Sequence, residues 1–334
     1  MIARPRQFVR FLLPWAVGLT ALTLLPTMAS LALSLSRNGG RLSATDFTWA
    51  GTQHYREALS IDTSHTLHPD DPWYWRVLGG KPNDPRLYTS LYNSLFYSLI
   101  AVPLGLAVSL AVALLIHRPI PGMGLARALV YLPSVLGGVA TLAIWSWLLN
   151  PQFGWINRVI RLTFDLLDGI VRPLTGRGTT SWPTPDWLYS PISCKPALIL
   201  MHLWTTGGAM LIFIAARRRM PPELYHAAQL DGAGAFSQFR CITWPQMTPA
   251  VFFNLLVSFI FSMQSFNESY LLQNRRQSDG ILFLALYVYQ TAFEPPYSLG
   301  YACALAWILF AVLLLFIVPV TWTSRRWVHY VDGH

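Results

Sequence analysis

The chain has 334 residues, of which 53% are hydrophobic and only 12% are charged. Soluble domains carry about 25% charged residues, so this composition excludes an ordinary soluble protein and predicts a surface that faces lipid. The net charge of +9 lies in short runs between apolar blocks, which argues against a nucleic-acid-binding protein.

Six apolar stretches are long enough to cross the bilayer, because about 20 helical residues span its roughly 30 Å of hydrocarbon. Glu268 is the only acidic residue inside any of them. The predicted fold is an all-α polytopic membrane protein with one transmembrane domain over residues 1–334. The expected spans are residues 11–35, 90–116, 126–149, 196–216, 248–272 and 300–323.

The first span follows Arg4, Arg6 and Arg10, a charge pattern that also precedes secretory signal peptides. Its apolar run is longer than that of a signal peptide, and no small-residue cleavage site stands out. We therefore expect this span to remain as a membrane anchor.

Two long segments separate spans. Residues 36–89 mix aromatic residues with acids, prolines and glycines. Residues 150–195 include the stretch RPLTGRGTTSWPTPDW, which does not require regular structure. We expect both segments to be loops on the same side of the membrane.

The distribution of Lys and Arg predicts the orientation. Six spans place both termini on one side, and Lys and Arg are denser in the termini and in the loops after the second and fourth spans. The arginine clusters at 217–219 and 325–326 directly follow spans. By the positive-inside rule, both termini are expected in the cytoplasm, and residues 36–89 and 150–195 are expected outside it.

The loop after the fourth span, residues 217–247, is predicted to begin with a short helix. Pro221 and Pro222 suit the first helical turn, and Glu223 favours the positive end of the helix dipole. Gly232 can adopt the left-handed conformation that ends a helix.

A second helix is predicted over about residues 235–242, after which Pro245 leads into the fifth span. A helix–glycine–helix segment can offer a small knob, here Ala227 and Ala228, to a soluble partner. It can equally be a plain amphipathic connector, and the residues alone favour neither interpretation.

This loop resembles the EAA loop of binding-protein-dependent ABC importer permeases, whose pattern is Glu-Ala-Ala, three residues, Gly, nine residues, Ile-x-Leu-Pro. Five positions of that pattern recur here at the same spacing: Ala227, Ala228, Gly232, Ile242 and Pro245. The flanking form ELYHAAQLDGA resembles the carbohydrate branch of the family.

Two positions depart from the family pattern. His226 stands in place of the glutamate, and Trp244 stands in place of the leucine. Glu223, three residues before His226, is predicted to lie on the same helix face and is the candidate to replace that glutamate.

The resemblance covers nearly the whole chain and is closest to first permease subunits of the lactose, glycerol-phosphate and maltose type. It is carried further by residues 49–59, 93–110, 131–157 and 291–306. The glycine-glycine-proline common after the fifth span in this family is replaced by RRQSDG at 275–280.

The resemblance implies a permease subunit of an ATP-driven importer for a sugar or sugar-like solute, in a bacterial or archaeal cytoplasmic membrane. It implies a second homologous permease subunit, two ATPase subunits and an extracytoplasmic solute-binding protein as partners, besides membrane lipid. The residues implied to couple the permease to the ATPase are Glu223, His226, Ala227, Ala228, Asp231, Gly232, Ile242 and Pro245.

The chain is not expected to be an enzyme, and no cofactor or metal is expected. It lacks the G-x-x-x-x-G-K-[ST] phosphate loop, of which Gly79-Gly80-Lys81 is only a fragment. Its three cysteines show no metal-ligand spacing.

Polar residues within the fifth span are candidates for the solute pathway, because polar groups in a membrane are costly unless they face a cavity. We expect Gln264, Asn267 and Glu268 to line the pathway, since amides and carboxylates bind sugar hydroxyls. The alternative, that they hold helices together, is equally consistent with the residues.

Three other functions remain as alternatives. A secondary transporter driven by an ion gradient predicts intramembrane relays of ionisable groups, for which one glutamate is poor support. A membrane-embedded enzyme predicts clustered histidines and acids, whereas the eight histidines are scattered. An ABC permease for a solute other than a sugar is the third.

Overall fold

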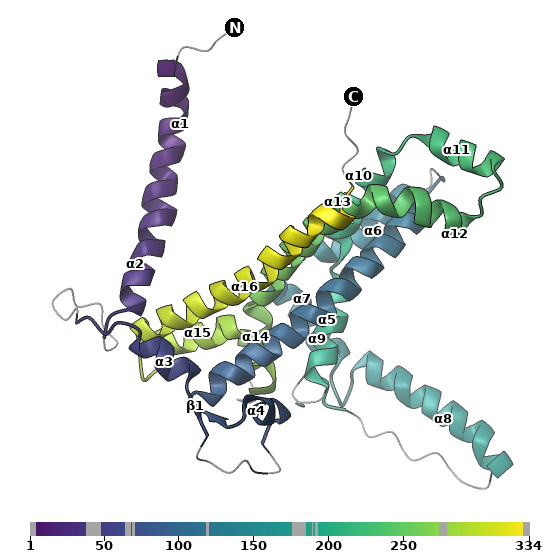
Figure 1. Ribbon diagram of the computed structural model, residues 1–334. Helices are drawn as coiled ribbons and strands as arrows, with labels where there is room; N and C mark the ends of the chain where they lie inside the picture. Colours follow the sequence, from purple (N-terminus) through teal and green to yellow (C-terminus); the bar gives the residue numbers. More distant parts are fainter. Residues whose placement is uncertain are drawn as a thin grey trace. The chain divides into compact units, whose positions relative to one another are not determined.

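A computed structural model describes residues 5–37, 48–63, 68, 71–117, 120–175, 185–188, 190, 193–273 and 279–329. Within these ranges the regular secondary structure is helical apart from one two-stranded sheet (Figure 1). The fold is that of an all-α polytopic membrane protein, as the composition predicts. Parts of the stretches 172–187 and 275–280 lie outside the described residues.

Four of the described helices are long and apolar enough to cross a membrane, and the number rises to six if each of two bent helix pairs counts as one span. Contacts divide the chain into two units, Met1–Tyr88 with Leu284–Val312 and Thr89–Phe283 with Leu313–His334. Two long helices, α5 (Pro85–Ile116) and α16 (Leu299–Trp327), contribute residues to both units.

The first unit begins with a long apolar helical run. Its elements are α1 (Pro5–Leu19), a π-helical turn (Thr20–Leu24), α2 (Leu25–Ser34), α3 (Gln53–Leu59), β1 (Ile61–Asp62), α4 (Trp73–Leu78), β2 (Lys81–Pro82) and α15 (Leu284–Phe293). In the antiparallel sheet, Ile61 lies opposite Pro82 and Asp62 opposite Lys81. The helices and strands within 36–89 show that this predicted loop segment is partly ordered structure.

Asp84 ties the elements of the first unit together. Its carboxylate accepts hydrogen bonds from the phenols of Tyr287 and Tyr301, at 2.7 and 2.6 Å, and from the backbone N–H of Leu87 at 3.1 Å. Burial, and then the hydrogen bond to Asp84, raise the pKa of the Tyr287 phenol above its ordinary value, so this group remains a donor. The start of α5 is thereby joined to α15 and α16.

The second unit carries the remaining elements. They are α6 (Met123–Val135), α7 (Gly138–Leu148), α8 (Trp155–Thr175), α9 (Cys194–Trp204), α10 (Gly207–Arg218), α11 (Pro222–Leu230), α12 (Ala235–Gln238), a π-helical turn (Phe239–Thr243), α13 (Trp244–Met263), α14 (Asn267–Gln273) and a 3-10 turn (Asp279–Ile281).

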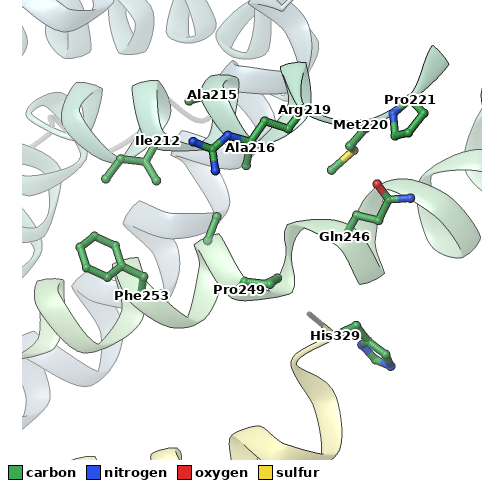
Figure 2. A pocket seen from close by; sticks show the side chains of 11 residues that line it. Ile212, Ala215, Ala216, Arg219, Met220, Pro221, Gln246, Pro249, Phe253 and His329 are labelled. Carbon is green, nitrogen blue, oxygen red and sulfur yellow. The ribbon is translucent and has the colours of Figure 1, made fainter. Parts of the chain in front are cut away.

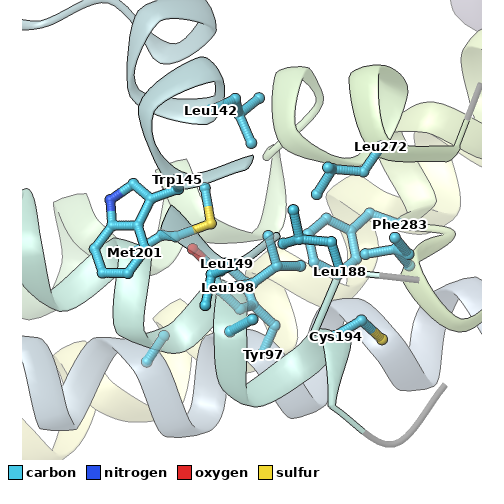
Figure 3. Close-up of a cluster of buried hydrophobic side chains, with 13 residues drawn as sticks. Tyr97, Leu142, Trp145, Leu149, Leu188, Cys194, Leu198, Met201, Leu272 and Phe283 are labelled. Atoms are coloured by element: carbon cyan, nitrogen blue, oxygen red, sulfur yellow. The ribbon is translucent and has the colours of Figure 1, made fainter. Parts of the chain in front are cut away.

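Two clusters of buried apolar side chains form the core of this unit. The first, shown in Figure 3, gathers side chains from α5, α7, α9 and α14, with Tyr97 stacked on Phe283 at 5.2 Å between ring centroids. The second gathers Val102 of α5, Phe213 of α10 and Met247 of α13. Because α5 enters both clusters, it is the central helix of the unit.

Three of the expected spans are broken rather than continuous. The expected span 126–149 consists of α6 and α7, which meet at 100°, and the span 196–216 consists of α9 and α10, which meet at 42°. The span 248–272 is interrupted between α13 and α14. Hydropathy did not reveal these breaks, because the residues around each bend are themselves apolar or uncharged.

The start of α10 packs closely against α6. A Cβ on Gly207 would lie 2.6 Å from the carbonyl oxygen of Val130 and 2.8 Å from the Cα of Tyr131, both on α6. Only glycine allows α10 to begin at this distance from α6.

The segment 150–195, expected to be a loop, contains the helix α8. A loop was predicted from the Pro- and Gly-rich second half of this segment, which does not require regular structure. The first half has helical periodicity, which the prediction did not use.

Candidate functional site

The loop segment 217–247 forms the helix–glycine–helix unit that its sequence predicts. Pro221 precedes α11 in an extended conformation, Pro222 is the first helical residue and Glu223 lies in the first turn. Gly232 has φ +75° and ends the helix, which confirms the predicted left-handed position. The N–H of Gly232 donates to the carbonyl of Gln229 at 3.0 Å, and the following N–H donates to the carbonyl of Ala228 at 2.8 Å, as in a Schellman motif.

Five of the eight predicted coupling residues are exposed, and the other three are half-buried. Glu223, His226, Ala227, Asp231 and Gly232 are exposed. The half-buried residues are Ala228 on α11, Ile242 in the π-helical turn and Pro245 in the first turn of α13.

The second helix differs from the expected range 235–242. It begins at Ala235, passes into a π-helical turn and continues directly into α13. The loop is therefore joined rigidly to the long helix that follows, because helical backbone continues from Ala235 to Met263.

Tyr225 fixes α11 on its base, and sequence reasoning did not single it out. Its hydroxyl lies 2.9 Å from the Thr243 hydroxyl and donates to the sulfur of Met220 at 3.3 Å. The Arg217 guanidinium lies over its ring, 4.1 Å from the centroid. One side chain thus joins α11 to the end of α10 and to the turn before α13.

Large apolar side chains are exposed around the knob. Leu230 is 90% exposed and Phe236 is 75% exposed, at the two sides of the Gly232 turn. Exposed apolar groups gathered at one loop mark an interaction surface.

A cavity of about 590 Å³ lies at the base of this loop (Figure 2). Its walls come from the end of α10, the start of α13 and the residues after α16: Arg219, Met220 and Pro221 face Gln246 and Pro249, with His329 at one side. The backbone N–H of His329 donates to the Thr248 hydroxyl at 3.0 Å. The C-terminal end of α16 is therefore packed beside the loop.

A second cavity, of about 580 Å³, lies among α5, α7, α9 and the break between α13 and α14. Tyr97, Thr141, His202 and Glu268 line it. The Glu268 carboxylate accepts a hydrogen bond from the Ser265 hydroxyl at 2.6 Å. The cavity thus brings together a phenol, a hydroxyl, an imidazole and a carboxylate from four helices.

The Thr141 hydroxyl of this cavity is buried and has no hydrogen-bond partner within the described part of the chain. A buried polar group without a partner is costly, so this hydroxyl is positioned for a ligand or for water. Thr141 and His202 carry no sequence signal for such a role, because they come together only through packing.

The three predicted pathway residues lie in different surroundings. Glu268 lines the cavity, and the Asn267 amide is placed beside Gly138 at the start of α7, where it would lie 3.5 Å from a Cβ. Gln264 is exposed at the end of α13 and is not among the residues that line this cavity. Two other polar residues of the fifth span, Asn254 and Ser262, bond to backbone carbonyls of their own helix.

The phosphate-loop fragment forms a structural turn. Gly79, with φ +76°, ends α4, and a Cβ on Gly80 would lie 2.6 Å from the carbonyl oxygen of Asp62. Lys81 belongs to β2. These residues shape the small sheet instead of opening a helix toward a phosphate.

Neither a metal cluster nor a disulfide is formed by the residues that the structure describes. No group of three or more His, Cys, Asp or Glu side chains could hold a metal ion there. Cys194 is buried, Cys303 is half-buried and Cys241 is exposed, and none of them forms a disulfide bond within the described part of the chain.

Comparison with known proteins places these features in a family. Residues 122–327 match the family described as the binding-protein-dependent transport system inner membrane component. The chain is 30% identical over 325 residues to the "probable ABC transporter permease protein YesP" of Bacillus subtilis, covering 96% of this chain and 91% of that protein.

A further relative and a solved structure extend the comparison. The lactose transport system permease protein LacF of Rhizobium radiobacter is 28% identical over 193 residues, 56% of this chain and 58% of LacF. The crystal structure of a bacterial ABC transporter involved in the import of the acidic polysaccharide alginate contains a chain with a TM-score of 0.71 and 18% identity. That match covers 99% of this chain and 98% of the other, and at this identity it shows the fold.

Proposed function

The chain belongs to the family of binding-protein-dependent transport system inner membrane components, and we propose that it is the permease subunit of an ATP-driven importer for a sugar or sugar-like solute. The sugar class is supported by the lactose permease among its relatives and by the groups that line the cavity of Tyr97, Thr141, His202 and Glu268. Hydroxyl, imidazole and carboxylate groups are suited to the hydroxyls of a sugar.

The observation that carries the proposal is the geometry of the loop segment 217–247. It offers an exposed knob, closed by Gly232 and fixed by Tyr225 to both α10 and α13. A soluble ATPase that moves this knob displaces two helices of the core together. This arrangement supports the transfer of a nucleotide-driven movement into the membrane domain.

We place this loop and both termini in the cytoplasm. The arginines at 217–219 and 325–326 follow membrane helices at the ends that meet around the cavity of His329, which is the pattern of the positive-inside rule. Two separate ATPase subunits would then hydrolyse ATP for this chain.

The remaining partners follow from the family. A solute-binding protein delivers the solute on the outer side, and a second, homologous permease subunit completes the pathway. For the solute pathway we retain Glu268 and Asn267 and add Tyr97, Thr141 and His202. Gln264 lies at the exposed end of α13, outside this cavity, and we retain it as a candidate pathway residue at that position.

Cross-linking tests the proposed coupling site. Cysteine is introduced by Ala227→Cys in a chain whose three native cysteines are replaced, and the importer is assembled with its ATPase in membranes. We expect a bifunctional maleimide to join this position to the ATPase, with a yield that changes when a nucleotide is added. Asp165→Cys on α8, expected on the outer side, is the matched control.

Capture of the ATPase by Asp165→Cys but not by Ala227→Cys would reverse the proposed orientation. Capture by neither, in a complex that still hydrolyses ATP, would remove the loop from the coupling interface.

A further inference from the structure

The helix α8 has two chemically different faces. Trp155, Val159, Leu162 and Leu166 recur at the spacing of one helix face, and each is at least half exposed. The neighbouring Leu167 is 46% exposed. Arg161 and Asp165 lie on a different side of the helix, Arg158 lies at the border of the apolar stripe, and all three are exposed.

Hydrogen bonds and apolar contacts fix the first turns of α8 to the rest of the second unit. The Asn157 side chain donates to the Asn150 carbonyl at 3.2 Å and accepts from the Trp187 indole N–H at 2.8 Å. Ile156 packs against the first core cluster, and Arg161 donates to the Pro151 carbonyl at 2.8 Å. These contacts use the first turns of the helix and leave the apolar stripe uncovered.

The chain around α8 places it next to the bilayer. It begins shortly after α7 ends at Leu148, and the segment that follows it leads into α9; both α7 and α9 belong to bent pairs that are apolar enough to cross a membrane. The apolar surface is continuous along the chain: Trp147 and Phe153 line one cavity, both are more than half exposed, and Trp155 follows at once.

We infer that the apolar face of α8 lies in the boundary between lipid headgroups and acyl chains, so that α8 is an interfacial membrane helix. A helix with one broad apolar face, one charged face and low net hydrophobicity lies in the plane of the interface instead of crossing the bilayer. Its 21 residues give α8 a length of about 31 Å, so the two different faces of the helix, and not its length, indicate the interfacial position.

The charged residues fit the same environment. The Arg158 guanidinium lies 6.0 Å from the centroid of the Trp155 ring, at the border of the apolar stripe. Tryptophan is enriched at headgroup depth, and arginine there reaches lipid phosphates. The acids Asp165 and Asp168 lie further along the helix on its polar side, where Asp165 is exposed and Asp168 is half-buried.

A soluble protein is the less suitable occupant. The stripe continues the apolar surface of a membrane helix, and a binding protein that dissociates in every cycle would leave it exposed to water each time. This inference rests on the membrane location of the chain and is independent of its solute.

Spin labels measure the position of α8 directly. The complete importer carries a single label at Leu166→Cys or, as the matched control, at Asp165→Cys, and is reconstituted into nanodiscs of phosphatidylcholine and phosphatidylglycerol. We expect a several-fold higher ratio of oxygen to nickel-chelate collision rates at position 166 than at position 165. Val159→Cys and Arg158→Cys form a second pair, and retained ATPase activity shows that the labelled complexes are intact.

Equal, water-like collision rates at both positions would overturn the inference. Protection of position 166 from both reagents, found only after the solute-binding protein is added, would also overturn it and assign the face to that protein. Failure of the ATPase cross-link at Ala227 would leave these lipid measurements unaffected, so the two proposals are tested separately.

Discussion

At the scale of single residues, two glycines of the loop segment 217–247 differ in backbone conformation. Gly232 has φ +75°, a conformation that costs other residues about 1–2 kcal/mol, and its N–H closes the end of α11. Gly234, two residues further, has φ −67° and open space around its Cα. Position 232 therefore requires a residue that tolerates a positive φ, whereas position 234 accepts a residue with a side chain.

Gly232→Pro is expected to abolish solute uptake while the chain still inserts into the membrane. Proline removes the N–H that bonds to Gln229 and cannot adopt a positive φ. Gly232→Ala is expected to lower uptake partially because it only strains the backbone. Uptake of labelled sugar by cells, with membrane levels measured by immunoblot, checks both variants.

Gly234→Ala is the matched control and is expected to transport normally. Normal uptake by Gly232→Pro would contradict the role of the loop in coupling.

Glu268 contributes a carboxylate to the candidate solute cavity. Glu268→Ala removes a carboxylate that lines the cavity and is expected to raise the KM for uptake several-fold, since it loses a hydrogen-bond acceptor for the solute. Ser262→Ala, whose hydroxyl bonds only within its own helix, is the control and should leave KM unchanged. A variant Glu268→Ala with unchanged KM and reduced membrane levels would instead assign the residue to helix packing.

At the scale of elements, the loop segment 217–247 is joined by side-chain contacts to α10 and to the turn before α13. The Tyr225–Thr243 hydrogen bond and the Arg217–Tyr225 contact join α11 to both helices, and the π-helical turn continues without a break into α13. A net hydrogen bond contributes about 1 kcal/mol and an exposed cation–π contact about 0.5–1 kcal/mol, so the two contacts together stabilise this position of α11 by about 2 kcal/mol.

Tyr225→Phe is expected to reduce uptake while ATP hydrolysis continues, because the knob then moves without carrying the membrane helices. The measurement is the ratio of solute transported to ATP hydrolysed in proteoliposomes. Thr243→Val should have a smaller effect, because Tyr225→Phe also removes the hydrogen bond to Met220, and the double variant should be no worse than Tyr225→Phe alone. Additive losses would show that the two side chains act separately.

At the scale of the whole molecule, broken helices surround the candidate pathway. The breaks between α6 and α7, α9 and α10, and α13 and α14 fall in three expected spans, and the cavity of Glu268 contains residues from both sides of these breaks. Interrupted helices in membranes are tolerated where they line a cavity or are buried in protein. Their presence around one cavity supports a passage for a polar solute.

The solute class is tested on the complete assembly. ATP hydrolysis by the importer in nanodiscs, with its solute-binding protein, is expected to rise several-fold with one sugar or oligosaccharide of a panel, and not with amino acids or inorganic ions. Stimulation by an amino acid alone would replace the sugar assignment while leaving the permease assignment intact.

The sequence by itself determined the membrane class, the helix–glycine–helix form of the loop segment 217–247 and the end of α11. These features depend on local patterns: long uncharged runs, prolines at a helix start and a glycine at its end. The continuity of the spans was not readable in this way, because an apolar run keeps its hydropathy whether it bends or not. Only tertiary packing decided that Gly207 meets α6, that Tyr225 joins α11 to the turn before α13, and that Thr141 and His202 join Glu268. Each of these depends on contacts between residues distant in the chain, which no local pattern encodes.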